Sequence, residues 1–198
     1  MDQFPLYFSI GREHILDLGQ GLDHILFVIA LVAAARPAEW KKILILITAF
    51  TIGHSLTLAM ATLELVNPPV PLVEFLIVAT ILFTSLYNVF SSTTGLGENA
   101  FIHYGLTLFF GLIHGLGFST MLRAVLAGSD AIMWPLLAFN LGLEFGQIIV
   151  VVLFSLLAFI SVEMAGAGRR EWKIAISSAI AGMSLMLLTD RFNSLFQP

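Results

Sequence analysis

The sequence contains no cysteine, which excludes disulfide bonds, thiolate metal sites and redox chemistry at sulfur. Charged residues are also scarce, at 11% of the chain, and the nine lysines and arginines are scattered rather than clustered. This excludes the basic patch that binds nucleic acid, so we expect no nucleic-acid partner. The sequence also lacks a glycine-rich phosphate-binding loop, so any transport must be driven by a gradient or by a partner protein.

Hydrophobic residues are abundant instead, at 58% of the chain, and the mean hydropathy is +0.95. These values are typical of an integral membrane protein, so the lipid bilayer is the first expected partner. The 198 residues leave room for about six spans of ~20 residues each. The sequence therefore predicts an all-α, polytopic helical bundle that forms one transmembrane domain over residues 1–198.

Six apolar segments are separated by breaks that contain proline, glycine or charged residues. The first segment follows acidic rather than basic residues, so we expect a retained span and not a cleaved signal peptide. Tryptophans near the predicted ends support the segmentation, because their rings favour the headgroup layer. The predicted spans cover residues 11–35, 43–65, 70–90, 100–127, 131–161 and 172–189.

The positions of lysine and arginine predict the orientation in the membrane. Six of them fall in the first and fifth connections, and three fall on the other side. Because basic residues favour the cytoplasmic side, both termini are expected outside, in the inner (plasma) membrane of a bacterium. The first group is Arg36, Lys41, Lys42, Arg169, Arg170 and Lys173, and the second is Arg12, Arg123 and Arg191.

The stretch from residue 11 to 24 places ionisable side chains before an apolar run of only eleven residues. As a helix that run reaches ~16 Å, whereas the hydrocarbon core is ~30 Å thick, so the polar stretch must also enter the membrane. On one helix Asp17 and His24 share a face, with His14 nearly in line and Asp23 about a quarter-turn away. The glycines here could equally break the helix.

Two further histidines are predicted near mid-membrane. His54 flanks a stripe of hydroxyl side chains in the second span, and His114 lies beside the small-residue ridge Gly111, Gly115 and Ser119 in the fourth. A satisfied packing histidine is the alternative in each case, and the ridge predicts a close helix contact. His103, nearer the membrane surface, is interpreted as an interfacial residue.

A carboxylate in the fifth span, Glu144, lies on one face with Asn140 and Gln147. At mid-span it requires a cation, a histidine or an ion as partner. The third span carries Thr80, Thr84 and Asn88 at four-residue spacing, which we interpret as helix-packing residues.

These ionisable residues could converge from four helices into one polar site. Imidazole and carboxylate donors without thiolate suit divalent nickel, cobalt, zinc, iron or manganese. A proton relay or a purely structural polar network uses the same residue types. The candidates are Asp17, Asp23, His24, His54, His114 and Glu144.

At these motifs the chain resembles the HupE/UreJ family of small membrane proteins, over nearly its whole length. The matching stretches are residues 21–24 (GLDH), 48–55 (TAFTIGHS), 109–115 (FFGLIHG) and 138–147 (AFNLGLEFGQ). The resemblance implies nickel or cobalt uptake and a possible metalloenzyme-assembly partner. The Asp-His and Gly-His-Ser elements also resemble the wider nickel/cobalt transporters.

The sequence departs from the family's nickel permeases at three presumed ligand positions. Those proteins carry a histidine where this chain has Asp17, a histidine where it has Phe110 and a glutamate where it has Gly117. His14 and His54 are expected to compensate, a pattern similar to the family's second subgroup.

Two functional classes follow from this reading, with a structural or accessory role behind them. The first is a divalent-metal permease, which captures the ion through Asp17, Asp23 and His24 and passes it to His54, His114 and Glu144. The alternative is an intramembrane zinc-dependent hydrolase, in which histidines hold zinc and a carboxylate helps to activate water. The sequence does not decide whether the chain is an enzyme.

Overall fold

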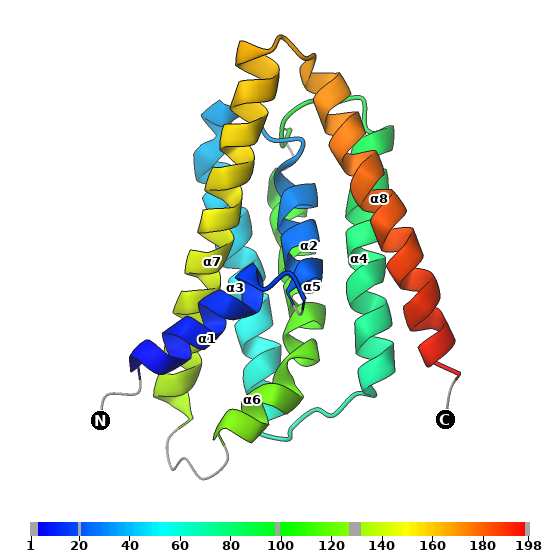
Figure 1. Ribbon diagram of the computed structural model, residues 1–198. Helices are drawn as coiled ribbons and strands as arrows, with labels where there is room; N and C mark the ends of the chain where they lie inside the picture. The colour runs from blue at the N-terminus through cyan, green and yellow to red at the C-terminus, as the bar shows by residue number, and fades with distance from the viewer. Residues whose placement is uncertain (1–3, 20, 98–99, 127–131, 197–198) are drawn as a thin grey trace.

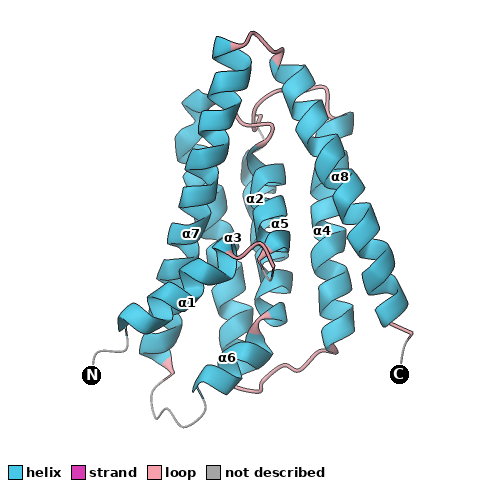
Figure 2. Ribbon diagram, viewed as in Figure 1, coloured by secondary structure: helices cyan, strands magenta, loops and turns pink. Residues whose placement is uncertain are grey.

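A computed structural model describes the chain except residues 1–3, 20, 98–99, 127–131 and 197–198. The described residues form helices and no strand, as Figures 1 and 2 show. The predicted all-helical fold is therefore confirmed. The α-helices are α1 (Phe4–Leu16), α2 (Leu22–Val32), α3 (Trp40–Thr62), α4 (Val70–Phe90), α5 (Ala100–Gly117), α6 (Ser119–Leu126), α7 (Met133–Phe159) and α8 (Arg169–Ser194), with a 3-10 turn at Pro37–Glu39 and a π turn at Ile160–Met164.

Among the described residues, four helical segments are long and apolar enough to cross a membrane, and two shorter apolar helices accompany them. The long segments are Pro37–Thr62, Val70–Phe90, Met133–Met164 and Arg169–Ser194, and the short ones are Leu22–Val32 and Phe101–Gly117. All six fall within the predicted spans or overlap them. The first predicted span is broken between α1 and α2, and the fourth between α5 and α6. The predicted boundaries at residues 127 and 131 lie outside the described residues.

Helix pairs with close backbone contact organise the bundle: α1 packs on α7, α3 on α5 and α4 on α8. Glycines permit two of these contacts. A Cβ on Gly11 would overlap the backbone of Phe139, and one on Gly111 would overlap the carbonyl oxygen of Phe50. The close approach predicted for the ridge on the fourth span is thus found at Gly111 and Gly115, whereas Ser119 begins α6.

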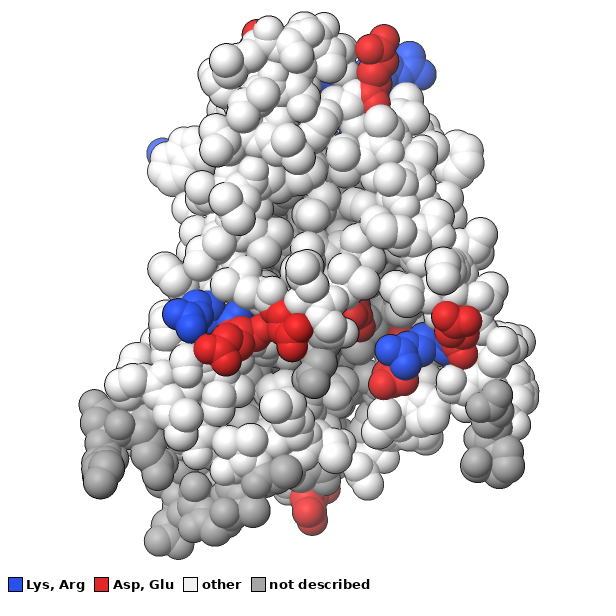
Figure 3. All heavy atoms as spheres, viewed as in Figure 1, with Lys and Arg blue, Asp and Glu red and all other residues white. Residues whose placement is uncertain are grey.

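The connections from α2 to α3, α4 to α5 and α7 to α8 lie at the upper end of Figure 1, and the ends of the described chain lie toward the lower end. The six basic residues of the first group accordingly belong to the upper end, at the starts of α3 and α8. Charged side chains in Figure 3 gather at the upper end and in a band lower down, with an uncharged surface between them and a further acidic group at the bottom edge. This distribution suits a bilayer between the two levels.

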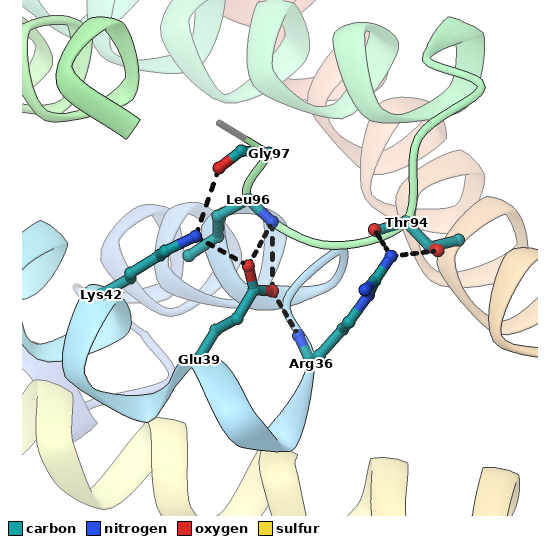
Figure 4. Close-up of polar contacts among 6 residues, drawn as sticks. All are labelled: Arg36, Glu39, Lys42, Thr94, Leu96 and Gly97. Atoms are coloured by element: carbon teal, nitrogen blue, oxygen red, sulfur yellow. Dashed lines mark hydrogen bonds and ion pairs between the residues drawn. The ribbon is translucent and has the colours of Figure 1, made fainter. Parts of the chain in front are cut away.

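The connection between α4 and α5 is held against the start of α3 (Figure 4). The Glu39 carboxylate accepts hydrogen bonds from the backbone N–H of Leu96 at 3.1 and 3.2 Å and from the Lys42 ammonium at 3.2 Å. The Arg36 guanidinium donates to the carbonyl and hydroxyl oxygens of Thr94. From the opposite side, Lys173 of α8 donates to the carbonyl oxygens of Ser91 and Thr93. These hydrogen bonds hold the connection against α3 and α8 at the upper end of the bundle.

Candidate metal centre

Three histidines from three helices meet inside the bundle: His14 of α1, His24 of α2 and His54 of α3. One ring nitrogen from each lies within 4.8 Å of the others. The ring centroids are 4.5 Å apart for His14 and His24, 5.8 Å for His24 and His54, and 6.1 Å for His14 and His54. His24 and His54 are buried, with 4% and 0% of their surface exposed. We call these three residues the histidine cluster.

The break between α1 and α2 brings His14 and His24 together. Asp17 follows the last turn of α1, and its carboxylate accepts the N–H of Gly19 at 2.8 Å, which favours a turn over a continued helix. A Cβ on Gly21 would overlap the carbonyl oxygen of His14, so the chain needs glycine to pass so close to α1. The same-face alignment expected on one continuous helix is replaced by two helices whose histidine rings touch.

His54 reaches the histidine cluster because α3 and α5 pack closely. A Cβ on Gly53 would overlap the carbonyl oxygen of Leu108, and one on Gly115 would overlap that of His54. This contact also places His114 of α5 at the cluster, with its ring centroid 5.1 Å from that of His24. The four rings therefore come from α1, α2, α3 and α5.

Aromatic side chains wall the histidine cluster. The ring centroid of Phe118 lies 4.0 Å from that of His14, and Phe139 stacks 6.4 Å from His54. Phe50 packs against His24 with centroids 6.1 Å apart. Apolar surroundings of this kind favour neutral imidazoles, the form that coordinates a metal ion.

Most ring nitrogens of the cluster have no hydrogen-bond partner within the described part of the chain. They are Nε2 of His14 and both ring nitrogens of His24 and His54, all buried. A buried polar atom without a partner costs free energy comparable to a lost hydrogen bond, so such atoms require an explanation. Their convergence fits a site whose ligands are imidazole nitrogens.

His114 has the surroundings of an oriented metal ligand. Its Nε2 lies 3.0 Å from the hydroxyl oxygen of Thr80, whose hydrogen is donated to the carbonyl of Ile77 at 2.7 Å. With its hydrogen on Ile77, the hydroxyl oxygen accepts the Nε2–H in the tautomer that leaves the lone pair on Nδ1. That nitrogen is buried and lacks a hydrogen-bond partner among the described residues. Metal-binding histidines commonly donate the second ring N–H in this way.

The three predicted carboxylates occupy different places. Asp23 begins α2 next to His24 and is half-buried, whereas Asp17 is exposed and bonded to the Gly19 backbone. Glu144 of α7 is half-buried and accepts a hydrogen bond from the Thr48 hydroxyl at 2.6 Å. Thr48 precedes His54 by six residues, or ~9 Å of helix rise. None of the three joins the group of close ring nitrogens.

A second polar contact between α3 and α7 lies one turn from the Glu144 pair, where the Thr51 hydroxyl donates to Oε1 of Gln147 at 3.0 Å. Asn140, the other amide of the predicted face, donates to the carbonyl of Leu136 at 2.8 Å. His103 lies far from the cluster along α5, with its ring against Tyr87, and its interpretation as an interfacial residue stays a prediction.

Two residues near the site were not predicted from the sequence. Thr80 was interpreted as a helix-packing residue, although its four-residue spacing from Thr84 and Asn88 indicated a polar face. Phe27, whose ring centroid is 5.1 Å from that of His114, carries no signal that separates it from other core phenylalanines.

The histidine cluster supplies nitrogen donors to an ion of intermediate softness, such as nickel, cobalt or zinc. Three nitrogens held tetrahedrally at ~2.1 Å from a metal are ~3.4 Å apart. The nitrogens here lie within 4.8 Å of one another, so at most a small adjustment of the rings brings them to coordination distance. Neutral rings cannot offset the charge of a divalent ion, and Asp23 is the carboxylate adjacent in sequence to the cluster.

The fold and the site together define a helical membrane protein with a buried histidine-rich centre. The chain belongs to the HupE/UreJ family, because the family model described as "HupE / UreJ protein" matches residues 1–191. No curated protein and no solved structure matches the chain.

Proposed function

We propose that the protein is a divalent transition-metal permease, with nickel or cobalt as the substrate class, and that the histidine cluster binds the ion during its passage. The observation that carries the proposal is the convergence of His14, His24 and His54 to within 4.8 Å inside the membrane-spanning bundle. Family membership supports it, because the resemblance to HupE/UreJ proteins implies nickel or cobalt uptake.

The chemistry of the cluster favours transient binding. Structural zinc sites use four ligands, often thiolates, which offset the charge of the ion and close the site. Here the donors are neutral imidazoles, and the sequence has no cysteine. The charge of a bound divalent ion is therefore only partly compensated, which lowers the barrier to its release.

Carboxylates at different levels of the bundle complement the cluster. Asp17 is exposed and Asp23 half-buried, so together they offer a negatively charged approach to His24. Glu144 of α7 accepts a hydrogen bond from Thr48, about two turns from His54 along α3, and is positioned to balance the charge of the ion. On the expected route, the two aspartates take part in capturing the ion, and Glu144 balances its charge farther inside the bundle.

The orientation of the route rests on the basic residues. With the upper end of Figure 1 in the cytoplasm, both termini and the acidic approach face the outside of a bacterial inner membrane. The ion is then delivered to the cytoplasm, where a metalloenzyme-assembly protein is the expected recipient.

An intramembrane zinc-dependent hydrolase is the competing function, because three histidines also hold catalytic zinc. Such an enzyme needs a general base within hydrogen-bond reach of the metal-bound water. Glu144 instead accepts the Thr48 hydroxyl, about two helical turns from His54. The separation of Glu144 from the cluster therefore disfavours Glu144 as that base.

Reconstitution into liposomes tests the proposal. We expect the unmodified protein to carry externally added nickel, cobalt or zinc to a chelating dye inside the vesicles, and His54→Ala to abolish this. Phe83→Ala, at an exposed ring outside the cluster, is the control and should retain transport. The proposal fails if no ion enters with unmodified protein that is correctly folded.

A further inference from the structure

A cavity of about 210 Å³ lies at the upper end of the bundle, beneath the connection between α4 and α5. Its walls come from α2, α4, α5 and α8, and its polar lining includes Thr84, Asn88 and Lys173. The histidine cluster lies deeper in the bundle, toward the end where the chain termini lie. The cavity is thus on the opposite side of the cluster from the proposed point of entry.

One face of α4 connects the cluster with this cavity. Thr80, Thr84 and Asn88 follow one another at four-residue spacing and so lie in a row along the helix. Thr80 accepts the His114 N–H at 3.0 Å, and its backbone carbonyl accepts the Thr84 hydroxyl at 2.8 Å. Thr84 already lines the cavity, so only ~6 Å of helix rise separates the residue bonded to His114 from the cavity wall.

Phe27 lies on α2, which packs against α4. On α2 it comes between His24, in the histidine cluster, and Leu31, in the cavity wall. Its side chain is 0% exposed, and its ring centroid lies 5.1 Å from that of His114 and 5.0 Å from that of Phe50. An apolar ring at this position blocks a hydrated or partly hydrated ion.

We infer that the Thr80–Thr84–Asn88 face of α4 is the exit route of the ion from the histidine cluster into the upper cavity, and that Phe27 is the constriction that closes it. The inference rests on the proposed function and adds the direction of release. Hydroxyl and amide oxygens replace part of the hydration shell of the ion without binding it tightly, which suits an exit path.

Lys173 favours release rather than storage at the end of this route. It is 1% exposed, and its ammonium is bonded to the Ser91 and Thr93 carbonyl oxygens in the cavity wall. The positive charge of the Lys173 ammonium repels the transported ion and so lowers the affinity of the cavity for it. An ion that passes Phe27 therefore leaves toward the solvent.

Ion flux measured beside equilibrium binding tests the route. We expect Thr84→Val to slow cobalt release into liposomes by about tenfold, while its cobalt dissociation constant stays that of the unmodified protein. Ser85→Ala is the control, because Ser85 is buried on the same helix but is not part of the cavity wall. Phe27→Ala should accelerate the flux by about tenfold, whereas Phe83→Ala, at an exposed ring, should not.

Thiol labelling gives a second readout, which is clean because the natural chain has no cysteine. In inside-out vesicles a water-soluble methanethiosulfonate should label Thr84→Cys but label Thr80→Cys only when Phe27 is also changed to alanine. Unaltered flux in Thr84→Val and Phe27→Ala, or absent labelling of Thr84→Cys, would overturn the exit route while cobalt transport by the unmodified protein persists. Failure of the unmodified protein to bind or move cobalt is a different result, which rejects the proposed function itself.

Discussion

Gly115 of α5 lies directly against the carbonyl oxygen of His54 of α3, so that a Cβ on Gly115 would overlap this oxygen. The contact brings two helices to the separation at which His54 and His114 both reach His24. A methyl group here forces the helices apart, because the obstructing atom belongs to the backbone and cannot rotate away. We expect Gly115→Ala to destabilise the fold by ~1–3 kcal/mol and to weaken metal binding.

The matched control is Gly105→Ala, on the same helix at a position where a Cβ would meet nothing within 4 Å. It should change neither quantity. Thermal unfolding in detergent and a cobalt titration measure both effects. Equal behaviour of the two variants would show that the close contact of α3 and α5 does not position the cluster.

His24 lies at the centre of the cluster, with His14, His54 and His114 all within 5.8 Å of it by ring centroid. His24→Ala removes a ligand, so it should weaken metal binding by more than the ~10–100-fold that is typical of outer partners. His103→Ala should leave the affinity unchanged, because this residue is remote from the cluster. Calorimetric titration of the two variants decides the assignment, and equal affinities would reject it.

If His114 is a metal ligand, Thr80 orients it by accepting its Nε2–H. Thr80→Val preserves the shape of the side chain but removes this acceptor, so Nδ1 loses its fixed orientation. We expect a ~10–100-fold loss of metal affinity. Thr80→Ser retains the hydroxyl and should restore most of the affinity, whereas equal losses in both variants would point to packing alone.

Glu144 tests the difference between transport and catalysis. Glu144→Gln removes the charge but keeps the size of the side chain, and should abolish nickel or cobalt accumulation in cells. Glu163→Gln is the control, because Glu163 is exposed and paired with Arg169 at the upper end. If the unmodified protein moves no ion in liposomes but cleaves a lipid or peptide in a Glu144-dependent way, the hydrolase is the correct function.

The six-to-three distribution of basic residues predicts that both termini lie outside the cell. Reporter fusions after Pro198 and within residues 36–42 should therefore report opposite sides of the membrane. A C-terminal fusion that is active in the cytoplasm would reverse the orientation and the direction of entry and release.

Hydropathy predicted the membrane segments, because each must present apolar side chains over most of a bilayer thickness. It did not place the helix breaks, since the glycines and Asp17 permitted both a continuous helix and a turn. The proximity of His14 to His24 follows from that turn and could not be read from helical spacing. Glu144 was expected at the same site, but its register along α7 places it beside Thr48.

The contact of Thr80 with His114 is a second feature that could not be predicted from the sequence. A threonine in a membrane helix commonly bonds to its own backbone, and Thr80 does donate to Ile77. Only the position of α5 reveals that the same oxygen also faces His114. His14 and His54, which are expected to compensate for missing ligands, lie beside His24, and the compensation itself stays a prediction.

X-ray absorption of the cobalt- or nickel-loaded protein is the most direct measurement of the proposed histidine centre. The predicted spectrum contains three or more imidazole nitrogens at roughly 2.0–2.1 Å from the ion. His14→Ala should remove one of them, because His14 joins the cluster through the break between α1 and α2. An ion bound only by oxygen ligands, or an imidazole signal unchanged in both His14→Ala and His54→Ala, would contradict the assignment of the cluster as the metal centre.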